Sequence, residues 1–148
     1  MQFAVSSRGV PSAARLRAWA SAALAACGAA PDGTELVLRI VGASEGRRLN
    51  RDYRGRDTPT NVLTFGYARS PLRGDLVLCG PVIAHEAREQ RKTRAAHYAH
   101  LVVHGILHLR GFDHDRASRA ARMEGAERRI LRGLGYGDPY AMGPAGAR

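Results

Sequence analysis

The stretch from His104 to His114 constrains this chain more than any other, because its sequence, HGILHLRGFDH, carries three histidines at specific spacing. Residues four apart lie on one face of a helix, so the imidazoles of His104 and His108 can bind a single ion. Gly111 is the residue type that ends a helix in the left-handed conformation, and the turn can bring His114 to the same ion. Neutral imidazole suits zinc, and three protein ligands with one open position are typical of a catalytic site. The spacing predicts one zinc ion held by these three histidines.

The same spacing occurs in the long metallopeptidase motif HExxHxxGxxH, with one difference. Gly105 stands where that motif has the glutamate that serves as general base. Without it, water would have to be activated by the metal alone or by a group from elsewhere in the chain. A zinc metallopeptidase is therefore a less favoured alternative.

The charge of the chain favours an anionic partner. Its 148 residues include 23 Lys and Arg against 13 Asp and Glu, a formal net charge of +10, as expected for a protein that binds nucleic acid. Lys92 is the only lysine, so a coding bias toward arginine is an alternative explanation of the charge. A basic surface raises affinity for phosphate without specifying a sequence.

Length and composition predict one domain over residues 1–148, without repeats and with a poorly ordered tail at 143–148. Cys27 and Cys79 match no metal or disulfide pattern and are expected to be buried thiols. Neither a membrane-spanning run nor a signal peptide is evident, so we expect a cytoplasmic protein without membrane contact, and we expect a monomer.

Hydrophobic periodicity predicts an α+β fold, with a small mixed four-stranded sheet packed with about five helices and a metal cleft at the helix of the histidine motif. The expected strands are 2–5, 35–41, 62–65 and 74–79, with a link over 66–73. The expected helices run from Ser12 to Cys27, from a Ser44 cap to Tyr53, from Pro81 to Lys92, from a Thr93 cap through His108, and over 116–134.

A second informative segment runs from Leu49 to Phe65 and has a polar turn with Gly55 and Pro59 at its centre. Such a turn can hold Arg54 and Arg56 near a ligand, but composition alone favours a solvated loop with ordinary surface arginines. Of the other histidines, His97 and His100 lie one to two turns before His104, too far along the helix to bind the same ion. We expect His97 to pack or to support the site and His85 to lie on the surface.

Three segments together resemble the YbeY family, the bacterial rRNA maturation factors usually described as metal-dependent endoribonucleases. The first is the histidine motif. The second is LNRDYRGRDTPTNVLTF, which is similar to the family's LNxxYRxxDxPTxVLSF with Thr64 replacing serine, and the third is GDLVLC, which is similar to GDIVIC. The resemblance covers roughly Glu35 to Tyr140. It implies an α+β domain with a metal cleft, cleavage of single-stranded RNA in 16S rRNA 3′ end maturation and ribosome quality control, and the ribosomal subunit and its associated proteins as partners. It also implies that Arg54 is functionally important.

The expected mechanism places zinc on His104, His108 and His114, with Arg54 contacting the scissile phosphate from the facing loop. The nucleophile is either water or the 2′-hydroxyl of the RNA, and the general base is not identified by the sequence. A non-catalytic RNA-binding ribosome assembly factor is the second alternative to the endoribonuclease.

Overall fold

The computed structural model describes residues 2–4, 9–29, 32–112 and 117–141 of the chain. Its elements follow one another as β1 (Gln2–Ala4), α1 (Ala13–Ala26), β2 (Glu35–Val41), α2 (Ala43–Arg54), β3 (Val62–Arg69), β4 (Leu72–Cys79), α3 (Gly80–Glu89), α4 (Arg94–Leu109) and α5 (Ala117–Gly133). In these ranges, no helix combines the length and apolar character that crossing a membrane requires.

The four strands form one mixed sheet in the order β1-β2-β4-β3. Pairing is parallel between β1 and β2 and between β2 and β4, and antiparallel between β4 and β3, so β3 is an edge strand. Strand β4 alternates its side chains, with Leu76 and Leu78 in the main core and Val77 and Cys79 in a smaller cluster with Leu49 of α2. The predicted α+β class with a mixed four-stranded sheet is confirmed.

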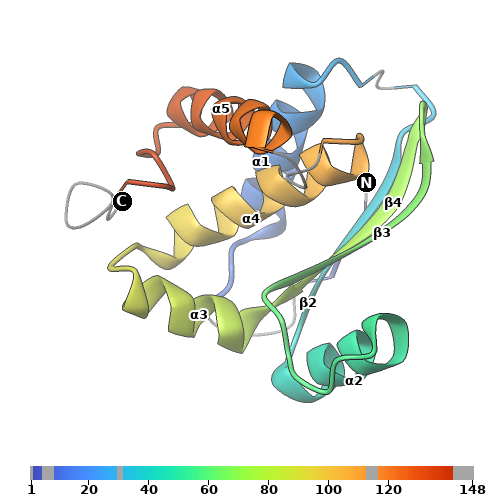
Figure 1. The fold of residues 1–148 in the computed structure, drawn as a ribbon, viewed down its shortest axis with the longest axis vertical. Helices are drawn as coiled ribbons and strands as arrows, with labels where there is room; N and C mark the ends of the chain where they lie inside the picture. Colours follow the sequence, from blue (N-terminus) through green and yellow to red (C-terminus); the bar gives the residue numbers. More distant parts are fainter. Residues whose placement is uncertain (1, 5–8, 30–31, 113–116, 142–148) are drawn as a thin grey trace.

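Helix α4 is the central element of the fold. It lies between the sheet and the pair α1 and α5, and it contacts β3, β4, α1, α3 and α5 (Figure 1). The predicted cap is present, because the Thr93 side chain accepts a hydrogen bond from the backbone N–H of Ala96 at 3.1 Å. Most residues of α4 are buried and most of those are apolar, as expected for a helix that packs against other elements on several sides.

Glycines allow α4 to approach the sheet closely. A Cβ atom at Gly105 would lie 2.2 Å from Cδ1 of Leu76, a fully buried side chain of β4. Gly66 and Gly74 face each other across β3 and β4, and both lie under Leu109. The position that carries the glutamate in metallopeptidases is therefore packed against the sheet, which leaves no room there for a carboxylate.

Several predicted boundaries differ from the structure. The expected link over 66–73 is wrong, because β3 continues to Arg69 and β4 starts at Leu72, joined by a short turn. Small and polar residues obscured these strand ends, which are stabilised by pairing and by contact with Leu109. Helix α2 is capped by Gly42 rather than Ser44, and α3 ends at Glu89 before Lys92.

Other expectations have mixed outcomes. Strand β2, the Ser12 cap of α1 and the helical stop at Gly111, with φ of 101°, agree with the sequence. Both cysteines are free, but only Cys79 is buried, since Cys27 is partly exposed. The tail 143–148 lies outside the described residues.

The packing at Gly105 predicts a stability difference between two helical glycines. Gly105→Ala should lower the free energy of unfolding by about 1–3 kcal/mol, because Leu76 would have to move in a filled core. Gly125→Ala in α5 should raise it by about 0.5–1 kcal/mol, since the new Cβ lies 3.6 Å from its nearest neighbour and alanine favours the helix. Urea denaturation of both variants measures the difference. An equal effect at the two positions would contradict the close packing of α4.

Candidate functional site

A surface cavity of about 520 Å³ brings together the candidate residues that the structure describes. His104 and His108 reach it from α4, and Arg54 reaches it from the end of α2. The rest of its lining comes from Tyr53 and from the chain between Thr60 and Phe65. The prediction that Arg54 lies in a loop is wrong, because Arg54 is the last residue of α2. His114 lies within 113–116, outside the described residues.

The two histidines of the motif differ in their surroundings. His104 is partly covered, with 25% of its side chain exposed, whereas His108, one turn later, is exposed at the cavity. A pair of imidazoles on one face of a helix, one supported by protein and one open to solvent, suits a ligand pair whose ion must also meet a substrate.

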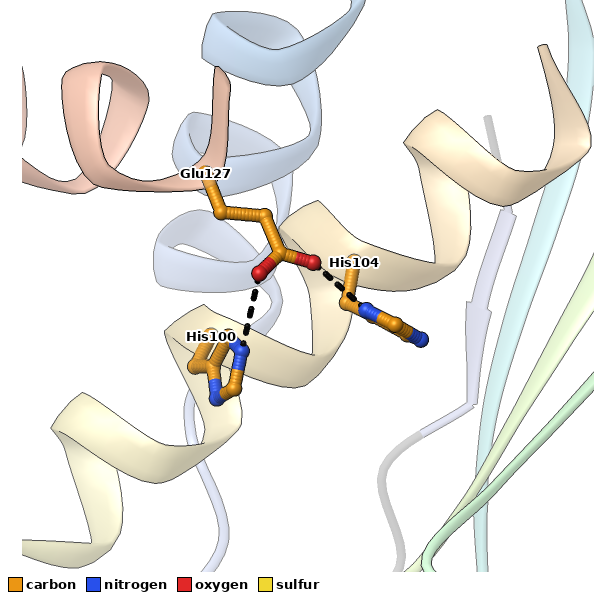
Figure 2. Close-up of side chains that lie close together, drawn as sticks. All are labelled: His100, His104 and Glu127. Atoms are coloured by element: carbon orange, nitrogen blue, oxygen red, sulfur yellow. Dashed lines mark hydrogen bonds and ion pairs between the residues drawn. The ribbon is translucent and has the colours of Figure 1, made fainter. Parts of the chain in front are cut away.

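Glu127 of α5 is the residue that sequence reasoning missed. Its side chain is fully buried and accepts hydrogen bonds from Nδ1 of His104 at 2.5 Å and from Nε2 of His100 at 3.3 Å (Figure 2). It also accepts a hydrogen bond from the hydroxyl of Tyr140. Burial by itself would raise the pKa of Glu127, but these hydrogen bonds outweigh it and lower the pKa to about 2. Glu127 is therefore an ionised carboxylate inside the protein.

The ionised carboxylate determines which nitrogen of His104 carries the proton. A carboxylate can only accept, so Nδ1 of His104 donates to Glu127 and Nε2 is the nitrogen with a lone pair. Nε2 points away from Glu127 in Figure 2. The buried carboxylate therefore leaves Nε2 of His104 as the nitrogen that can bind a metal ion, which is the arrangement in which hydrogen-bonded carboxylates orient histidine ligands.

A second arrangement of ligands is also compatible with the geometry. Ligand atoms of His100, His104 and Glu127 lie within 4.8 Å of one another, so these three side chains form a group that could hold a metal ion. The sequence predicts that His100 is too distant to bind the ion, whereas in the structure its ring lies beside those of the candidate ligand His104 and of Glu127. The side chain of His100 is 12% exposed, so an ion within this group would be more enclosed than one at the cavity.

A weak sequence signal for Glu127 exists. It lies four residues after Met123 and three before Ile130, in the apolar stripe of α5, where an acidic residue needs a buried partner. Its partner His104 lies 23 residues earlier in the sequence, so no local motif contains both residues.

Two asparagines hold the cavity wall formed by the segment after α2. The buried Asn50 donates from Nδ2 to the carbonyl oxygen of Thr58 at 2.7 Å. Asn61 donates from Nδ2 to Glu86 at 3.0 Å, and Glu86 in turn accepts from Nε2 of His97 at 2.8 Å. These bonds tie a segment rich in turn residues to α2, α3 and α4.

The same network explains His97 and His85. Burial lowers the pKa of His97, opposed by its hydrogen bond to Glu86, so its ring is a packed and supporting group, as predicted. His85 is on the surface, also as predicted, with 65% of its side chain exposed.

The fold and the cavity together define a class of protein. An α+β domain whose cavity combines two histidines of one helix, an arginine and a buried carboxylate behind one of the histidines is an arrangement typical of metal-dependent hydrolases.

Comparison with known proteins identifies the family to which the chain belongs. The model of the family described as Endoribonuclease YbeY matches residues 4–135. Curated proteins named Endoribonuclease YbeY from Alkalilimnicola ehrlichii and Bordetella avium are 54% and 52% identical, over 96% of this chain and 90% and 92% of theirs. The chain belongs to the YbeY family, and the resemblance noted in the sequence is confirmed.

A solved structure supports the fold independently. The solution structure of TM1509 from Thermotoga maritima aligns with a TM-score of 0.63 over 90% of each chain, at 22% sequence identity. At that identity the likeness shows the fold alone.

The hydrogen bonds of Glu127 predict a large effect of its removal. Glu127→Ala should lower the free energy of unfolding by about 3 kcal/mol in the presence of a chelator, because the His100, His104 and Tyr140 groups that donate to it lose their buried acceptor. Glu124→Ala is the matched control on α5, since its partly exposed carboxylate faces Arg128 at 3.9 Å and is worth at most about 1 kcal/mol. Chemical denaturation gives both values. Similar losses for the two variants would rule out the proposed role of Glu127.

Proposed function

We propose that this protein is a metal-dependent endoribonuclease that cuts single-stranded RNA in the maturation of ribosomal RNA. The observation that carries the proposal is the meeting of Arg54, His104 and His108 in one cavity of a chain that belongs to the YbeY family. Cleavage of RNA requires a site that positions a phosphodiester and stabilises its charge, and these side chains suit both tasks.

The metal we assign is a single zinc ion held by His104, His108 and His114. The donor set fits, because three imidazoles suit zinc and because Glu127 fixes the His104 tautomer that presents Nε2. We favour this set over the group of His100, His104 and Glu127, since the carboxylate of Glu127 is already occupied by three hydrogen bonds and lies at 0% exposure, away from any substrate. A zinc ion bound by His104, His108 and His114 would supply Lewis acidity at the attacked phosphodiester.

Arg54 is the group we assign to the phosphate. Its guanidinium can donate two parallel hydrogen bonds to phosphate oxygens and offset the negative charge that develops there. Its position at the end of α2 places it on the wall of the cavity across from α4. Arg54 therefore acts as an electrostatic catalyst and does not need to transfer a proton.

Tyr53 supports the choice of an unpaired RNA strand. Its ring is 68% exposed at the cavity and is held edge-on against Phe65, with ring centroids 5.2 Å apart. A base of a single strand can stack on such a ring, whereas bases inside a duplex cannot.

The biological setting we assign follows the family. We infer that the substrate is precursor rRNA at the 3′ end of the 16S molecule, that the enzyme works in the cytoplasm on the ribosomal subunit and with ribosome-associated proteins, and that the same activity serves ribosome quality control. We also infer that residues 1–148 form one domain, because most of the described helices and strands contribute to one main core around α4. We propose that this domain acts as a monomer.

Loss of one ligand should abolish cleavage. His108→Ala should reduce cleavage of a precursor rRNA fragment at least about 100-fold and lower the zinc content of the purified protein, because two imidazoles hold zinc much less tightly than three. A chelator should do the same to the unmodified enzyme, and added zinc should restore it. Cleavage is followed on gels and zinc by elemental analysis.

The control for this experiment is His85→Ala, which removes an exposed histidine of α3 that does not line the cavity. This variant should cut and bind zinc like the unmodified protein. Equal cleavage by the His108→Ala and His85→Ala proteins would show that the activity does not come from this site.

Arg54 should affect turnover more than folding. Arg54→Ala should lower kcat about 100-fold, and Arg54→Lys should recover part of it, because lysine keeps the charge without the paired donors. Arg51→Ala is the control on the same helix, since Arg51 pairs with Asp52 at 3.3 Å and lies outside the cavity lining. Steady-state kinetics on a labelled RNA measure these effects. If the Arg54→Ala and Arg51→Ala proteins have equal kcat, Arg54 has no role in the mechanism.

A further inference from the structure

Three cavities adjoin one another along β3 and α4. The cavity of Arg54 and the histidines shares Thr64 and His108 with a second cavity of about 340 Å³. The second shares Arg69 with a third of about 520 Å³, which we call the arginine pocket and which is lined by Arg69, Arg110, Gly111, Phe112, Arg119 and Arg122. The shared residues link the three cavities in a row along β3, and together we call them the groove.

The groove follows the edge strand of the sheet. Between Val62 and Arg69, β3 spans about 23 Å at the usual rise of a strand, and no strand pairs with its outer edge within the described ranges. The groove therefore extends well beyond the reach of one phosphodiester at His108.

Positive charge is concentrated along this groove. Its described lining holds Arg54 at one end, four arginines at the other and no acidic residue. Arg110 is held by the carbonyl oxygens of Arg69 and Cys27, so it helps to build the wall. Among the described residues, no carboxylate pairs with Arg69 or Arg122, although both side chains are exposed. Arg122 lies over the ring of Phe112, at 5.8 Å from its centroid.

An exposed aromatic ring lies between the two charged ends. Tyr67 is 69% exposed, lines the middle cavity and stands at the irregularity in the pairing of β3 with β4. Its hydroxyl donates to Asp75 at 2.8 Å, which occupies the nearest carboxylate and fixes the ring. Tyr53 and Tyr67, the two most exposed aromatic residues of the described chain, thus both line the groove.

We propose that this groove is the path of a single RNA strand and that Arg69 and Arg122 bind its phosphates in a subsite beyond His108, with a base stacked on Tyr67. The proposal rests on the endoribonuclease function and adds the direction in which the substrate leaves the cavity. Alternating phosphate and aromatic contacts along a basic groove are how single strands are bound without sequence preference.

Removal of the subsite should weaken binding of a long RNA. The double variant Arg69→Ala/Arg122→Ala should bind a fluorescent 12-nucleotide single-stranded RNA about tenfold more weakly, and the slope of log affinity against log salt should fall by about 1.4, for two lost phosphate contacts at ~0.7 each. Arg88→Ala/Arg132→Ala removes the same charge outside the groove and should stay within about twofold. Fluorescence anisotropy measures the affinity, and a chelator in the buffer prevents cleavage during the measurement. Thermal unfolding checks the fold of each protein.

Tyr67 provides an independent test of stacking. Tyr67→Ala should weaken binding of the same RNA at least about fivefold, whereas Tyr67→Phe keeps the ring and should restore it. Restoration by phenylalanine separates stacking from a role of the hydroxyl in holding Asp75.

The outcomes separate this proposal from the function on which it rests. If the unmodified protein cuts RNA but the two double variants bind equally, the groove is wrong and the endoribonuclease stands. If it binds RNA without ever cutting, the endoribonuclease is wrong, and the same comparison of affinities still decides the groove. An unmodified protein that does not bind single-stranded RNA overturns both.

Discussion

The close contact between α4 and the sheet is the constraint on which the rest of the structure depends. Gly105 lets the helix lie against Leu76, and the facing glycines of β3 and β4 admit Leu109. Because the helix cannot shift on such a filled surface, His104 and His108 are held at a defined place beside β3. The same contact excludes the carboxylate that a metallopeptidase would need, so packing of the core and choice of chemistry have one cause.

Burial of Glu127 transfers that rigidity to the chemistry of the site. A carboxylate at 0% exposure is stable only because three donors surround it, and in return it orients His104 from behind. Helix α5 thus takes part in the site without reaching the cavity. Burying the charged Glu127 destabilises the fold by itself, and its role is to select the tautomer of His104.

The edge of the sheet explains why the site is open along one direction. Because β3 lacks an outer partner within the described chain, the space beside it continues from Arg54 past His108 to the arginine pocket. Edge strands are usually protected from pairing with other chains, and here charge, an irregularity at Tyr67 and exposed arginine serve that purpose. The exposed arginines that protect this edge can also bind the phosphates of RNA, the proposed substrate.

Local patterns were enough to predict the fold class, strand β2, the caps at Ser12 and Thr93, the turn at Gly111, and a helix carrying His104 and His108. Each depends on residues a few positions apart, where periodicity and capping act. Three features became evident only in the folded chain: 66–73 extends two strands, Arg54 ends a helix at the cavity, and Glu127 orients His104. Those features arise from contacts between segments distant in the chain, whose energies no local pattern contains.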